Sequence, residues 1–410
     1  MQNAIEAIEA EVPYTQAKIS ILLAGKSLII TGRNGSGKTS LLLKLYEKLR
    51  LRTESDGYAK VPTWETRARQ FKETMDASPE GSPQYIEANN HYKVCRSNID
   101  PYIALPNVKL IDELSFFKGV VNKSAIVDLF AANRQSRILD ARSAQSLDYQ
   151  QKIPVKQEDI GSDLEQHLVN LAARRAFAKT SDVENIDLVS RIDAWFRNFN
   201  ENLRFLFEDE SVHLEFNQNS FKFHISQSGK QSYTLQDLSS GFSSIFSVLS
   251  SLIMRAQYIN GDPASLSGTV FIDEIDAHLH VSLQKKVLPF LIGTFPNLQF
   301  IVTTHSPFVL TSVSDAAIFD MDKREQVEDL SKYSYEAVLE GLFQVGPSSF
   351  LLNQKIADLA ALSSNEENFD EEAIRQLVGE LSPNASNLDD ESRYFLNHAE
   401  FLLKKNKMTK

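Results

Sequence analysis

The chain has 410 residues, enough for one large hydrophobic core or two modest ones. Its net charge of -11 argues against a surface coated for nucleic acid, because phosphate contacts need clustered Lys and Arg. The longest apolar run, residues 19–30, is interrupted by Gly25 and Lys26 and is too short to span a bilayer. A single cysteine, Cys95, excludes an internal disulfide framework and favours a reducing compartment. We therefore expect a cytoplasmic protein without a membrane partner.

The first fifty residues predict a strand, a glycine-rich loop and a helix. Before them, the apolar residues among 4–8 hint at a short helix within residues 1–18. The apolar run 27–31 predicts a strand, and residues 40–46 predict the start of a helix. A strand followed by a loop and a helix is the structural context that a phosphate-binding loop requires.

The loop between that strand and helix matches the pattern G-x-x-x-x-G-K-[ST] at every defined position. Its glycines let consecutive backbone N–H groups point at a phosphate chain, and the helix N-terminus adds partial positive charge. We expect Lys38 to reach the β- and γ-phosphates and Thr39 to bind Mg²⁺ through its hydroxyl. The residues predicted to contact a nucleoside triphosphate are Gly32, Asn34, Gly35, Ser36, Gly37, Lys38, Thr39 and Ser40.

The middle of the chain predicts two insertions and further strands. Residues 52–107 are polar and loosely patterned, which indicates an insertion of helices and loops. Strand-like runs return at 108–111 and 125–131. Residues 160–208 carry one apolar stripe with helical spacing, and a period of two at residues 212–225 then predicts a β-hairpin.

Two groups of basic residues leave nucleic-acid binding possible. Arg134, Arg137 and Arg142 follow the strand at 125–131, and Lys404, Lys405, Lys407 and Lys410 lie near residue 410. Each group could line a local basic groove. We favour a solvated face for the arginines and a frayed tail for the lysines, because that is what such charge runs usually are.

A second motif lies more than two hundred residues after the first, where the apolar strand 269–272 ends in Asp273 and Glu274. Buried in a parallel sheet beside the phosphate loop, such a strand would deliver Asp273 to the Mg²⁺ shell. Glu274 would then orient and deprotonate the attacking water. The alternative is a strand that merely ends in solvated acids, and the phosphate loop earlier in the chain favours the catalytic interpretation.

The segment Leu238-Ser239-Ser240-Gly241 opens a helix just upstream of the acidic strand. Here the sequence resembles the ABC-type ATPases, whose signature is Leu-Ser-x-Gly before a helix. The resemblance implies that Ser239 and Gly241 cap the γ-phosphate held by the phosphate loop of another subunit. It also implies a D-loop at 275–277 and a switch histidine at His305, after the apolar strand 300–304. For the Q-loop glutamine, Gln135 is the first choice, with Gln70 and Gln84 as alternatives.

The residues after Glu274 distinguish branches of this family. They read Ile275-Asp276-Ala277-His278-Leu279-His280, with Thr303-Thr304-His305-Ser306-Pro307 further on. This pairing resembles the OLD, RecF and SMC-like ATPases and differs from transporter subunits, although Val281 replaces the usual proline. His278 and His280 could suggest a metal, but two histidines without a third ligand more often pack or cap a helix.

The last part of the chain predicts helices. Asp320-Met321-Asp322 is superficially similar to the Asp-x-Asp of Toprim nucleases, but the following residues look helical, so we interpret it as the end of a core strand. The helices in residues 323–410 are expected either to provide a platform for self-assembly or for an effector, or only to cover the core.

The predicted fold is therefore an α/β P-loop ABC-type ATPase core, a mixed sheet flanked by helices, formed by residues 1–51 and 108–322. The resemblance implies a head-to-tail dimer that sandwiches two Mg·ATP, with Lys38, Glu274 and His305 as catalytic residues and Thr39 and Asp273 as metal ligands. The chain further resembles stand-alone ATPases of the PARIS, Septu and retron anti-phage systems, which implies a separate effector such as a nuclease. The alternative is a RecF-like repair ATPase that clamps DNA.

Overall fold

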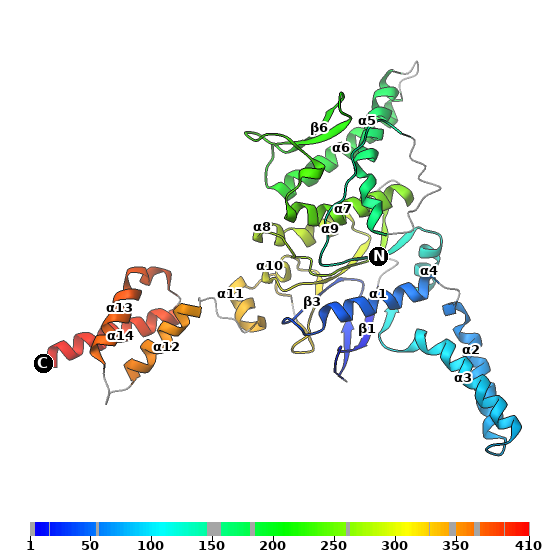
Figure 1. Ribbon diagram of the computed structural model, residues 1–410, viewed down its shortest axis with the longest axis horizontal. Coiled ribbons are helices and arrows are strands. Elements are labelled where there is room, and N and C mark those ends of the chain that lie inside the picture. The colour runs from blue at the N-terminus through cyan, green and yellow to red at the C-terminus, as the bar shows by residue number, and fades with distance from the viewer. Residues whose placement is uncertain are drawn as a thin grey trace. The chain divides into compact units, whose positions relative to one another are not determined.

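The structure is a computed structural model that describes residues 5–15, 17–54, 57–145, 157–180, 185–259, 263–327, 329–343, 350–364, 370–388 and 390–409. The chain forms two compact units, Met1–Tyr333 and Ser334–Lys410 (Figure 1). The first unit contains the predicted α/β core, and the second is helical, as expected. None of the described helices is both long and apolar enough to cross a membrane.

A six-stranded sheet with the order β12-β11-β3-β10-β9-β5 forms the centre of the first unit. All neighbouring pairs are parallel except β11 and β12, so the sheet is mixed. Parallel strands end at the same edge, so the residues that follow β3, β9 and β10 meet there. The strands are β3 (Ser27–Thr31), β5 (Ala125–Phe130), β9 (Ser267–Ile272), β10 (Leu298–Thr303), β11 (Ala316–Asp320) and β12 (Glu325–Val327).

A second sheet, with the order β2-β1-β4, corrects the prediction for the N-terminus. Its strands are β1 (Ile5–Glu11), β2 (Lys18–Leu22) and β4 (Asn107–Leu110), so residues 5–11 form a strand and not a short helix. The register of β1 against β4 shifts between Ile5 and Ala7. This irregularity buries both Ile5 and Ile8, and their spacing of three is what imitates a helix.

Helix α1 (Lys38–Glu54) follows the phosphate loop and buries Leu41, Leu42, Leu45 and Leu49 in the core cluster that includes strands β1 to β3. The first insertion follows it as a pair of helices, α2 (Gly57–Asp76) and α3 (Pro83–Ile103), that pack along each other. Helix α4 (Glu113–Val121) and β5 then return the chain to the core.

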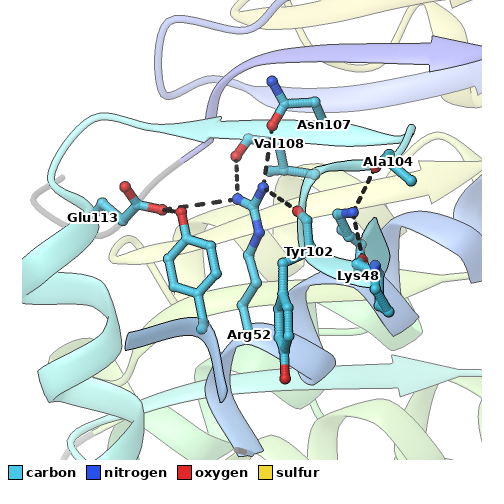
Figure 2. Close-up of polar contacts among 9 residues, drawn as sticks. Lys48, Arg52, Tyr102, Ala104, Asn107, Val108 and Glu113 are labelled. Carbon is cyan, nitrogen blue, oxygen red and sulfur yellow. Dashed lines mark hydrogen bonds and ion pairs between the residues drawn. The ribbon is translucent and has the colours of Figure 1, made fainter. Parts of the chain in front are cut away.

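Two buried cations at the C-terminal end of α1 hold the end of α3 and the start of β4 (Figure 2). The Nζ of Lys48 donates to the carbonyls of Pro101 and Ala104. The Nη1 of Arg52 donates to the Val108 carbonyl at 2.8 Å, and its Nη2 donates to Tyr102 and Asn107. Burial, helped by Arg52, lowers the pKa of Lys48 to about 8. These carbonyls at the base of the first insertion are thereby satisfied.

The second insertion consists of helices and the predicted hairpin. Helices α5 (Leu164–Thr180) and α6 (Ile186–Phe207) pack on each other, and β6 (His213–Asn217) pairs with β7 (Lys222–Ser226). Strand β8 (Tyr233–Thr234) completes this small sheet and leads to helix α7 (Ser240–Ile259). The remaining helices of this unit are α8 (Val281–Gln284), α9 (Val287–Thr294) and α10 (Pro307–Leu310), with 3₁₀ turns at Gln157–Asp163, Leu235–Asp237 and Pro263–Ser265.

The second unit has a hydrophobic core of its own, which includes Leu359, Ile374, Leu396 and Ala399. It begins at Ser334 and not at residue 323, because β12 pairs with β11 in the central sheet. Its elements are α11 (Tyr335–Val338), a π-helical turn at Leu339–Phe343, α12 (Phe350–Ser364), α13 (Glu371–Leu381), a 3₁₀ turn at Ser382–Asn387 and α14 (Asp390–Thr409).

Candidate active site

The phosphate loop links β3 to α1 at the carboxyl edge of the central sheet. Gly35 and Gly37 adopt φ values of 80° and 94°, a left-handed conformation that glycine enters without strain. A Cβ atom at Gly37 would also lie 3.1 Å from the Cβ of Pro13, so the loop packs closely on the turn between β1 and β2. The backbone conformation is therefore one that the glycine spacing of the motif makes possible.

Lys38 is buried under the loop, where its Nζ donates to the carbonyls of Gly32 at 2.9 Å and Arg33 at 3.0 Å. Burial lowers the pKa of Lys38, while the nearby carboxylates, of which Asp322 acts most strongly, oppose that shift. The ammonium group thus lies within the loop that is expected to receive phosphates.

The turn that follows β9, residues 273–278, is called the acidic turn and contacts the phosphate loop directly. The Thr39 hydroxyl donates to Oδ1 of Asp273 at 3.0 Å, and the Thr303 hydroxyl donates to the same oxygen at 2.6 Å. Thr303 also accepts the backbone N–H of Glu274 at 2.7 Å. A threonine hydroxyl beside an aspartate carboxylate fits Mg²⁺, which binds hard oxygen ligands and completes its shell with phosphate and water.

Glu274 is half-buried and adopts a left-handed φ of 44°, which is unusual for a residue with a side chain. The carbonyls around it are held by Arg134, which is buried and not on the solvated face that its neighbours Arg137 and Arg142 occupy. No local pattern predicts this contact, because Arg134 and Glu274 are 140 positions apart. The prediction of a solvated face is therefore wrong for Arg134.

His305 follows β10 and lies half-buried near Lys38. Burial and then the charge of Lys38 lower the pKa of His305, against the opposing effect of Asp276, Glu274 and Asp273. The neutral imidazole is therefore favoured at pH 7. The structure brings together Lys38, Thr39, Asp273, Glu274 and His305 from the ends of three parallel strands.

The signature segment lies at the start of α7. Ser239 is exposed, whereas Gly241 is buried against the turn that follows Glu274. A Cβ atom at Gly241 would lie 3.0 Å from the carbonyl of His278, so a larger residue would push these segments apart. Gly241 is thus needed for close packing within the chain, in addition to the role in trans that the resemblance implies.

His280 is the N-cap of α8, and its Nδ1 accepts from the backbone of Ser282. Within the described part of the chain, no three His, Cys, Asp or Glu side chains gather into a possible metal site. Gln135 is exposed. In the same segment, the side chain of Arg134 contacts the acidic turn. The role of Gln135 therefore stays a prediction.

Two residues beside the phosphate loop were missed by the sequence interpretation. Tyr14 is 90% exposed, has a φ of 63°, and its hydroxyl lies 3.3 Å from Oγ of Ser40. Asp322, after β11, accepts the backbone N–H of Arg33 at 2.6 Å and so holds the first turn of the loop. Tyr14 belongs to no local pattern. The Asp-x-Asp segment does lie at the end of a core strand, as interpreted, but its contact with the phosphate loop was not predicted.

The fold and the site define a P-loop ATPase-type core, and comparisons with known proteins agree. Residues 110–311 match the family described as "AAA domain, putative AbiEii toxin, Type IV TA system". The chain is 32% identical over 134 residues to the Retron Vc95 probable ATPase of Vibrio cholerae serotype O1 biovar El Tor, covering 32% of this chain and 23% of that protein. It is 35% identical over 96 residues to the Septu protein PtuA of Bacillus mycoides (strain KBAB4), covering 23% and 13% respectively.

These matches confirm the expected relationship to the retron probable ATPases and to the Septu protein PtuA. The chain spans a quarter or less of the length of the curated relatives that it matches. Among solved structures, it is similar to an SmcHead bound to the C-winged helix domain of ScpA, with a TM-score of 0.38 and 15% identity, covering 77% of this chain and 94% of that one.

Proposed function

We propose that this chain binds and hydrolyses ATP, and that the contact between Thr39 and Asp273 carries this assignment. The hydroxyl and the carboxylate come from the two nucleotide motifs, 234 positions apart, and meet beside Lys38. Such a convergence is what phosphoryl transfer needs, because most of its acceleration comes from positioning and charge.

In this mechanism the phosphates lie against the backbone N–H groups of residues 35–40, with Lys38 beside the β- and γ-phosphates. Mg²⁺, held by Thr39 and Asp273, neutralises charge on the phosphates when bound. Glu274 accepts a proton from water while the water oxygen attacks the γ-phosphorus. The bond between the γ-phosphorus and the oxygen that leaves with ADP breaks in the same step. His305, favoured as a neutral imidazole, offers a hydrogen bond to the γ-phosphate.

Two further contacts are proposed for the rest of the nucleotide. The exposed ring of Tyr14, beside Ser40, offers a surface on which the base can stack. Ser239 and Gly241 are proposed to cap the γ-phosphate held by a second subunit, so that a head-to-tail dimer encloses two ATP molecules. The exposure of Ser239 supports this role in trans.

The Glu274→Gln variant tests the catalytic assignment. It keeps the shape of the side chain and removes the base, so ATP binding should persist, turnover should fall by ~10²-fold or more, and an ATP-bound dimer should accumulate. ATP binding is measured by titration calorimetry, turnover by phosphate release and assembly by light scattering. Glu47→Gln, on the exposed side of α1, is the matched control. Wild-type turnover in Glu274→Gln would contradict the mechanism.

We further propose that the ATPase acts in an anti-phage defence complex, where it holds and releases a separate effector of the nuclease class. The similarity to a retron-associated ATPase and to a Septu protein supports this assignment. Co-purification with the product of a neighbouring gene, and toxicity of that product alone, are the expected results. ATP-dependent DNA binding with a steep salt dependence, in the absence of such a partner, would favour a DNA-clamping repair ATPase instead.

A further inference from the structure

Arg134 is the buried cation around which the acidic turn is arranged. Its Nη1 donates to the carbonyls of Asp273 at 2.8 Å and Ala131 at 3.0 Å. Its Nη2 donates to the carbonyls of Ile275 at 3.1 Å and Glu274 at 3.2 Å. One guanidinium group thus satisfies three successive carbonyls of the turn and ties them to the end of β5.

This arrangement accounts for the unusual backbone of Glu274. A left-handed residue with a side chain persists only where its surroundings over-determine it, and here its N–H bonds to Thr303 while its carbonyl bonds to Arg134. The carbonyls converge on a planar fork of donors, which an ammonium group cannot reproduce. The direction of the Glu274 side chain therefore depends on Arg134.

The same segment reaches the signature helix. Two residues after Arg134, the backbone N–H of Ser136 donates to Oγ of Ser243 at 3.0 Å and to its carbonyl at 3.2 Å. Ser243 lies in the first turn of α7, two residues after Gly241, which itself packs on the carbonyl of His278. Residues 134–136 thus join the acidic turn to the helix that begins with the signature.

We propose that Arg134 is a positioning residue that orients the Glu274 side chain toward the attacking water. Through the contact of Ser136 with Ser243, it also connects the acidic turn to the signature helix, which is presented to the second ATP site. The proposal rests on the proposed ATPase function. It assigns Arg134 no contact with ATP. We expect its effect on the rate to pass through Glu274, and the cycle below distinguishes this from an effect through the Asp273 carbonyl.

The test is a double-mutant cycle with Arg134→Lys and Glu274→Gln in the 410-residue chain, with Arg137→Ala as the control at a neighbouring exposed arginine. Arg134→Lys should leave the Kd for ATP within about threefold and lower kcat by ~10²-fold, because the base is misdirected while the phosphate loop is intact. Adding Glu274→Gln to Arg134→Lys should then lower kcat by less than about threefold.

The outcomes separate the two proposals. If Glu274→Gln lowers kcat equally in both backgrounds, Arg134 does not act through Glu274 and this inference is overturned, whereas the ATPase assignment stands. If Glu274→Gln leaves the wild-type rate unchanged, the role of Glu274 as the base fails, and if the wild-type chain releases no phosphate from ATP, the ATPase assignment itself fails. Should Arg134→Lys not fold, Ser243→Ala tests the link between the acidic turn and the signature helix instead. A lower kcat at unchanged Kd supports the link, and wild-type kcat with wild-type cooperativity in ATP overturns it.

Discussion

Replacing Thr303 by valine should damage stability and turnover together. Thr303 is fully buried, donates to Asp273 at 2.6 Å and accepts the N–H of Glu274 at 2.7 Å. Valine has nearly the same shape, so the change removes only the hydroxyl. A hydrogen bond to a carboxylate contributes ~1.5–3 kcal/mol, and an unsatisfied buried N–H costs ~1–3 kcal/mol. We therefore expect the free energy of unfolding to fall by about 4 kcal/mol.

The same change should slow turnover, because both Asp273 and Glu274 lose a fixed partner. A loss of ~3 kcal/mol of transition-state stabilisation corresponds to about 10²-fold in rate. Urea unfolding of the first unit and phosphate release measure the two effects. Thr303→Ser, which keeps the hydroxyl and loses one methyl group, should cost only about 1 kcal/mol. Equal losses in Thr303→Ser and Thr303→Val would show that the Thr303 hydroxyl does not have this role.

Three further predictions concern other parts of the first unit. Tyr14→Ala should raise the Kd for ATP by ~10-fold or more in a fluorescence titration, because base stacking contributes ~1–3 kcal/mol, whereas Tyr14→Phe should leave the Kd unchanged. Equal affinities of the two variants for ATP would argue against stacking. Arg255→Met should destabilise the fold by ~3–5 kcal/mol in urea, because it leaves the buried Asp128 carboxylate without this ion pair; a change below ~1 kcal/mol would contradict that cost. Burial lowers the pKa of His167 to about 4 in the folded chain. As pH falls from 6.5, the imidazole is therefore protonated in the unfolded chain before it is protonated in the folded chain. Unfolding free energy should therefore decrease by up to ~1.4 kcal/mol per pH unit between pH 6 and pH 4, and His167→Gln should remove that slope in urea titrations at each pH.

The sequence predicted those features that depend on neighbouring residues. The phosphate loop, the strand that ends in Asp273 and the hairpin at β6 and β7 are each local patterns, and the structure contains them at the expected places. The parallel direction of the strands follows from them, because buried strands separated by helices run parallel, whereas the strand order does not, since β3 lies between β10 and β11.

The features that were missed depend on contacts between distant segments. Arg134 looked like part of an exposed run because nothing near it in sequence shows that three carbonyls of another loop surround it. Tyr14 lies beside Ser40 only after β1 and β2 have formed their sheet. In β1 the shift in register placed Ile5 and Ile8 on one face, and a local reading mistakes that spacing for a helix.

Lys48 and Arg52 connect the far end of α1 to another segment, so that this helix is held at both ends. Its 17 residues span about 25 Å at ~1.5 Å per residue, with the phosphate loop at one end and Lys48 and Arg52 near the other. Those side chains grip the end of α3 through its backbone. A tilt of about 5° in α1 would displace its far end by about 2 Å, given the length that ~1.5 Å per residue implies. One helix thus connects the first insertion to the nucleotide site, although the two share no catalytic residue.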